Sequence, residues 1–122
     1  MGVINVSPES FFKRSVKVSK ESLKRAAYKM ETEGADLIDV GAMSTAPYLK
    51  TQISVEEEKR RLGTALSVLS KITKLPLSVD TTRSEAARVA LDSGASIIND
   101  ISGLTHDSKM GSIIRKARGA IL

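Results

Sequence analysis

Short apolar segments alternate with segments of helical periodicity along the whole chain, and this alternation constrains the fold more than any other feature. An amphipathic segment, with apolar side chains at helical spacing, separates each apolar segment from the next. Such a pattern predicts a parallel sheet with right-handed helical crossovers, whose strands are buried on both faces. The predicted strands are Met1–Val6, Leu37–Val40, Pro76–Asp80, Ile97–Ile101 and the first residues of a fifth at Ala120–Leu122.

Two helix starts have a recognisable local signal. Ser54 followed by Glu57, and Thr82 followed by Glu85, have the spacing of a capping box, in which each side chain binds the other residue's backbone N–H. The second pair predicts a helix that begins near Arg83. Helix ends are expected at Gly34 and Gly94.

The composition narrows the class of protein. A length of 122 residues fits one domain, and the absence of cysteine excludes disulfides and thiolate metal sites. His106 is the single histidine, so this chain cannot form a multi-histidine metal site. The net charge is +5, but with two Phe, two Tyr and no Trp the chain has few aromatic side chains on which bases could stack, so nucleic-acid binding is not expected. No apolar run approaches the ~20 residues of a membrane span, and a cytoplasmic protein is expected.

Polar residues follow the predicted strands where each one ends. Asn5, Asp80 and Asn99 lie at or near such ends, and the segment from Asp39 to Thr45 begins within the second strand and continues beyond its end. Because the site of a (β/α)8 barrel draws on several strand ends, this distribution favours a barrel over a doubly wound sheet. No Gly-rich fingerprint opens the first helix, which also weakens a dinucleotide-binding fold. The carboxylate of Asp80 can accept two N–H donors side by side, as an amino-heterocycle offers. The alternative is that these side chains brace the top of the barrel and cap its loops.

Four segments then resemble the motifs of the dihydropteroate synthase family, in order and over nearly the whole chain. The opening segment reads Gly-Val-Ile-Asn-Val-Ser-Pro-Glu-Ser-Phe at residues 2–11. The second covers residues 34–41 and continues to Ser44 and Thr45. The third and fourth are Ser78–Thr81 and Ile97–Gly103. The family has a (β/α)8 TIM-barrel fold, so residues 1–122 are expected to form about the first four βα units and the start of strand 5, the N-terminal part of one pterin-binding barrel domain.

The resemblance also implies an activity and roles for individual residues. Members of the family join a dihydropterin methyl pyrophosphate to p-aminobenzoate and release pyrophosphate, with Mg²⁺ as cofactor. By resemblance, Asn5 would hold the magnesium ion and the pyrophosphate, and Thr45 would line the pyrophosphate and amine side. Asp80 and Asn99 would hydrogen-bond the pterin. The expected partners are therefore the pterin pyrophosphate and an arylamine, without nucleic acid or membrane, and a homodimer is compatible with this interpretation.

The sequence departs from the family pattern at residues 12–15 of the first loop and at two positions of the second, and these departures leave the amine open. Met43 and Ala46 stand where the family usually has Glu before the Ser-Thr pair and Arg after it. The sequence therefore resembles a divergent branch, and the amine is p-aminobenzoate or a related compound. Two alternatives remain: a pterin-dependent methyltransferase domain, which shares the barrel, and an inactive half-barrel fragment. The Ser-Pro-Glu-Ser-Phe segment at residues 7–11 favours the synthase.

Overall fold

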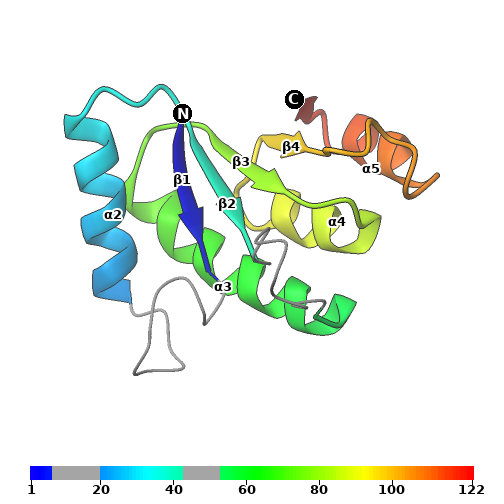
Figure 1. Cartoon of the computed structure of the whole chain (residues 1–122), viewed down its shortest axis with the longest axis horizontal. Helices are drawn as coiled ribbons and strands as arrows, with labels where there is room; N and C mark the ends of the chain where they lie inside the picture. The colour runs from blue at the N-terminus through cyan, green and yellow to red at the C-terminus, as the bar shows by residue number, and fades with distance from the viewer. Residues whose placement is uncertain (7–19, 43–52) are drawn as a thin grey trace, which may run out of the picture.

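The structure of the chain is a computed structural model, and it describes residues 1–6, 20–42 and 53–122. Strands and helices alternate throughout these residues, as the sequence predicts (Figure 1). The elements are β1 (Gly2–Asn5), α2 (Lys20–Thr32), β2 (Ile38–Gly41), α3 (Val55–Ile72), β3 (Leu77–Asp80), α4 (Ser84–Asp92), β4 (Ile97–Asn99), α5 (Met110–Lys116) and β5 (Ala120–Ile121).

The five strands form one parallel sheet in the order β1-β2-β3-β4-β5. A doubly wound sheet reverses its strand order at a switch point, and this sheet has no reversal. Right-handed crossovers between strands in sequential order place every helix on the same face of the sheet. Accordingly, consecutive helices contact each other, α2 with α3, α3 with α4 and α4 with α5, as one layer (Figure 1). This is the arrangement of consecutive βα units in a (β/α)8 barrel, and it confirms the predicted fold class.

The hydrophobic core lies between the sheet and this helical layer. Ile4, Val40, Val79 and Ile98 share one register row across the first four strands, and each is fully buried. Side chains in a strand alternate between the two faces, so the neighbours of these four residues point to the face without helices. The helices contribute buried aliphatic side chains to the same core: Leu23, Ala27, Leu62, Ala65, Leu66, Leu69, Ala86 and Ala90.

The two predicted capping boxes have different outcomes. Ser54 is the N-cap of α3, and its side chain accepts a hydrogen bond from the Glu57 N–H at 3.1 Å. The prediction for Thr82 and Glu85 is wrong in detail. Helix α4 does begin where expected, but its N-cap residue Arg83 makes no side-chain cap, and the Ser84 N–H donates to Asp107 Oδ2 at 2.8 Å. Asp107, from the segment after β4, thus accepts a hydrogen bond at the start of α4, where the side chain of Thr82 was predicted to be the acceptor.

The fourth strand is shorter than predicted, because it ends at Asn99 and not at Ile101. The Asp100 carboxylate accepts hydrogen bonds from the backbone N–H of Ser102 at 2.8 Å and of Leu104 at 3.2 Å. These bonds fold the chain into a turn directly after β4, and they leave the Ile101 side chain exposed. The fifth strand begins at Ala120, as predicted.

Candidate functional site

Three of the four predicted substrate-binding residues stand in one register row at the carboxyl ends of the strands. Asn5 pairs with Gly41, Gly41 with Asp80, and Asp80 with Asn99. This row is one step further along the strands than the buried aliphatic row, so it faces away from the helices. The site is therefore built on the ends of four adjacent strands, where barrels of this class place their ligands. Thr45 lies outside the described residues.

Gly41 leaves space between Asn5 and Asp80. A Cβ atom at residue 41 would lie 3.8 Å from Asp80 Cβ and 3.9 Å from Asp80 Oδ2, which is ordinary contact distance. Any longer side chain there would extend over the Asp80 carboxylate from the neighbouring strand. The glycine therefore keeps one side of this carboxylate open to a ligand.

Asp80 stands in an environment that opposes its ionisation. Partial burial raises the pKa of the Asp80 carboxyl above its ordinary value, and the negative charges of Asp39, Glu58 and Asp100 raise this pKa further. A carboxylate that is held close to other carboxylates gains free energy when N–H donors or a positive charge approach it. The site is thus electrostatically suited to a ligand that presents several N–H groups.

The side chain of Asn99 reaches back to the second strand. Its Nδ2 donates a hydrogen bond to Asp39 Oδ2 at 3.4 Å, although the two residues are 60 positions apart in the sequence. Asp39 is almost fully buried, and among the described residues its Oδ1 has no hydrogen-bond partner. The same holds for the hydroxyl of Ser78, the register partner of Asp39 on β3.

Sequence reasoning did not assign a role to Asp39. The signal was present, because an acid interrupts the apolar strand Leu37–Val40. An acid in such a strand needs a partner, but the sequence does not show that this partner is Asn99.

A buried polar network lies next to the site, at the point where β3 leads into α4. Glu58, from the first turns of α3, is fully buried. It accepts a hydrogen bond from Thr81 Oγ1 at 2.6 Å and forms an ion pair with Arg83 Nη1 at 3.1 Å. Thr81 Oγ1 also accepts the Arg83 N–H at 3.2 Å. Because both oxygens of Glu58 are occupied within the protein, we interpret this network as support for the strand end that carries Asp80.

Two arginines bind the backbone on either side of residues 43–52. Arg61 Nη1 donates to the carbonyl oxygen of Ala42 at 3.3 Å, and its Nε pairs with Glu57 at 2.8 Å. Arg83 Nη1 donates to the carbonyl oxygen of Ile53 at 2.7 Å. Helix α3 and the β3–α4 connection therefore fix the positions of Ala42 and Ile53.

The residues that could hold a metal ion are few. Over residues 1–6, 20–42 and 53–122, no group of three His, Cys, Asp or Glu side chains has the geometry of a metal site. Asn5 offers an amide oxygen, which is a ligand type that Mg²⁺ accepts. Magnesium commonly takes one or two protein ligands and completes its shell with phosphate oxygens and water, so a single oxygen at Asn5 fits such an ion. None of the described helices has the length and apolar character of a membrane span.

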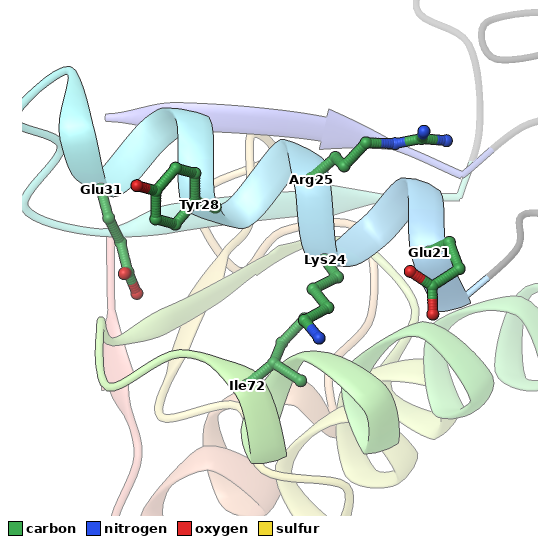
Figure 2. Close-up of a pocket in the computed structure, with 6 residues that line it drawn as sticks. All are labelled: Glu21, Lys24, Arg25, Tyr28, Glu31 and Ile72. Atoms are coloured by element: carbon green, nitrogen blue, oxygen red, sulfur yellow. The ribbon is translucent and has the colours of Figure 1, made fainter.

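A separate hollow of about 370 Å³ lies in the helical layer, between α2 and the end of α3 (Figure 2). Charged side chains and one tyrosine line most of it, and Ile72 forms part of its floor. It contains no residue of the strand-end row. The lining residues are Glu21, Lys24, Arg25, Tyr28, Glu31 and Ile72.

Comparisons with known proteins agree with this geometry. The sequence model of the family described as pterin binding enzymes matches residues 1–122. The chain is 35% identical over 122 residues to a dihydropteroate synthase of Synechocystis, and this match covers 100% of the chain and 42% of that protein. It is 39% identical over 113 residues to a dihydropteroate synthase of Bacillus subtilis, and this match covers 93% of the chain and 39% of that protein.

A solved structure shows the same arrangement of elements. The dihydropteroate synthase of Xanthomonas albilineans with 4-aminobenzoic acid superposes with a TM-score of 0.86 at 35% identity, covering 98% of this chain and 43% of that one. The chain thus spans less than half the length of each of these relatives. Its sheet, its row of polar strand ends and the match over all 122 residues lead to one conclusion: the chain belongs to the pterin binding enzyme family.

Proposed function

We propose that this chain provides the pterin-binding strand ends of a dihydropteroate synthase-like transferase of folate biosynthesis. The observation that carries the proposal is the register row of Asn5, Gly41, Asp80 and Asn99, in a chain of the pterin binding enzyme family. The synthase is preferred over a pterin-dependent methyltransferase, because the relatives compared above are named dihydropteroate synthases.

The hydrogen-bonding groups match one edge of a pterin. The 2-amino group and the adjacent ring N–H of a pterin are neighbouring donors, and the Asp80 carboxylate can accept both. Asn99 can donate and accept at the next position along the ring. Burial and the neighbouring carboxylates oppose the negative charge of Asp80 and raise its pKa, and the N–H groups of such a ligand would offset this penalty.

The reaction joins the pterin to an arylamine. The bond between the pterin methylene carbon and the pyrophosphate oxygen breaks, a bond to the amine nitrogen forms, and the amine loses a proton. Asn5, at the end of β1, would hold Mg²⁺, and the bound ion would stabilise the negative charge of the departing pyrophosphate. The residues of this chain would bind and orient the pterin, and no side-chain nucleophile is needed. Thr45 would line the pyrophosphate and amine side, and the amine would be p-aminobenzoate or a related arylamine.

We also propose that residues 1–122 are the N-terminal part of a single barrel domain. The strand order without reversal and the coverage of less than half of each relative support this. The remaining groups around the pterin would then come from later strands of the same barrel.

Replacing Asp80 with asparagine tests the proposed function. We expect Asp80→Asn to weaken binding of the dihydropterin methyl pyrophosphate by about 1–3 kcal/mol, because an amide replaces a charged acceptor. Isothermal titration calorimetry on the full-length protein measures this loss. Asp36→Asn is the matched control, since Asp36 is exposed and precedes β2 at the opposite end of the sheet. Equal affinities of the wild type and Asp80→Asn would contradict the proposal.

A further inference from the structure

The carboxylate of Asp39 is hydrogen-bonded to the side chain of Asn99, one of the two residues proposed to bind the pterin. Asp39 lies on β2, two residues before Gly41, the register partner of Asp80, and its side chain is on the same helix-free face of the sheet. Its exposed fraction is 4%, and Oδ2 accepts the hydrogen bond from Asn99 Nδ2. The other carboxylate oxygen has no partner among the described residues. An acid this deeply buried is costly, so its contact with Asn99 calls for an explanation.

The chemistry of this contact restricts Asn99. A side-chain amide carries an acceptor oxygen and a donor nitrogen on two similar branches, and it can turn about its terminal bond to exchange them. An ionised carboxylate only accepts hydrogen bonds, so it binds the Nδ2 branch and repels the Oδ1 branch. With the Asp39 carboxylate as its acceptor, Asn99 therefore directs its nitrogen toward β2 and presents its oxygen on the opposite side.

We propose that Asp39 is a positioning residue, which fixes the amide of Asn99 in one orientation and thereby determines the donor and acceptor pattern that Asn99 offers to the pterin. The proposal rests on the proposed function, because it assumes that Asn99 contacts the ligand. It assigns no direct ligand contact to Asp39. In the competing interpretation Asp39 has a purely structural role. Its replacement would then lower stability and weaken the binding of both substrates to the same extent, whether or not Asn99 is present.

A double-mutant cycle on the full-length protein separates these interpretations. The variants are Asp39→Asn, Asn99→Ala and the combination of both, and calorimetry measures the dissociation constant of the dihydropterin methyl pyrophosphate for each. Asparagine at residue 39 keeps the size of the side chain, but it can donate as well as accept, so Asn99 can turn either way. We expect Asp39→Asn alone to weaken pterin binding about tenfold, and less than about twofold in the Asn99→Ala background, because residues in one hydrogen-bonded network are not additive.

Steady-state kinetics give the second readout. Asp39→Asn should raise KM for the pterin substrate and leave KM for the arylamine unchanged, since a fixed amide orientation concerns the pterin alone. Asp36→Asn, on the exposed residue before the same strand, is the matched control and should alter neither value. If Asp39→Asn does not fold, Asp39→Ser is used in the same cycle, because it also removes the charge.

Each outcome decides the proposal. The proposal is wrong if Asp39→Asn weakens pterin binding by the same factor with Asn99 and with Ala at residue 99. It is also wrong if Asp39→Asn leaves the dissociation constant of the pterin unchanged, or if it raises KM equally for both substrates. Asp80→Asn, measured in parallel, separates this failure from that of the proposed function. If Asp80→Asn weakens pterin binding and Asp39→Asn does not, only the role of Asp39 is wrong. If neither variant changes the affinity for the pterin, the proposed site itself is wrong.

Discussion

Replacing Arg83 with methionine should lower the free energy of unfolding by about 3–5 kcal/mol, which is the usual cost of leaving a buried charge without its partner. Glu58 is fully buried, and Arg83 is its cationic partner at 3.1 Å. Methionine keeps an unbranched apolar side chain but removes the charge and the hydrogen bond to the Ile53 carbonyl oxygen. Urea denaturation of the full-length protein, followed by circular dichroism, measures the loss.

The double variant Glu58→Leu with Arg83→Met is the control for this interpretation. Replacing both partners of a buried ion pair with apolar residues is often close to neutral, whereas removing one is not. The double variant should therefore recover part of the stability that Arg83→Met alone loses. If Arg83→Met costs less than about 1 kcal/mol, the pair behaves as a solvent-exposed salt bridge and does not support the end of β3.

The second large effect is expected at the turn between α4 and β4, where Gly94→Ala should destabilise the protein by roughly 2–5 kcal/mol. Gly94 has a φ of +115°, and an added Cβ atom would lie 2.6 Å from Ser70 Cβ. Alanine would thus meet both backbone strain and a steric clash with α3. The turn leads directly into β4, so the same substitution should disturb the position of Asn99.

Gly34 provides a matched control, because it has a φ of +88° and nothing within 4 Å of an added Cβ atom. Gly34→Ala should therefore show the backbone cost alone, about 1–2 kcal/mol. A second control, Gly94→Ala combined with Ser70→Gly, removes the contacted side chain and should recover the steric part. Thermal and urea unfolding of the wild type, Gly34→Ala, Gly94→Ala and the Gly94→Ala, Ser70→Gly double variant separate the backbone strain from the steric clash. Equal losses of unfolding free energy for Gly34→Ala and Gly94→Ala would contradict the steric clash.

The features that the sequence predicts correctly depend on local patterns. Apolar strands and helical stripes follow from residue spacing, and parallel strands of a barrel bring their carboxyl ends together. The alignment of Asn5, Asp80 and Asn99 follows from these two facts alone, and the structure confirms it. The N-cap of α3 at Ser54 was predictable for the same reason, because the capping side chain and the Glu57 N–H that donates to it are close in sequence.

The features that sequence reasoning missed depend on contacts between distant segments. Asn99 binds Asp39 across 60 positions, and Glu58 pairs with Arg83 across 25. Asp107 caps α4 from 23 residues away, so the local pair Thr82 and Glu85 was misleading. In each case the residue type indicated that a partner was needed, but only the packing of α3, α4 and the sheet identifies that partner. The predicted contact at Thr45 falls outside the described residues and stays a prediction.

A crystal structure of the full-length protein with a bound dihydropterin tests the central claim most directly. The account predicts that the amino edge of the pterin lies within hydrogen-bond distance of the Asp80 carboxylate, with Asn99 on the adjoining part of the ring and its Nδ2 still bound to Asp39. A pterin bound elsewhere, for example in the hollow between α2 and α3 (Figure 2), with Asp80 and Asn99 not in contact with it, would contradict the account.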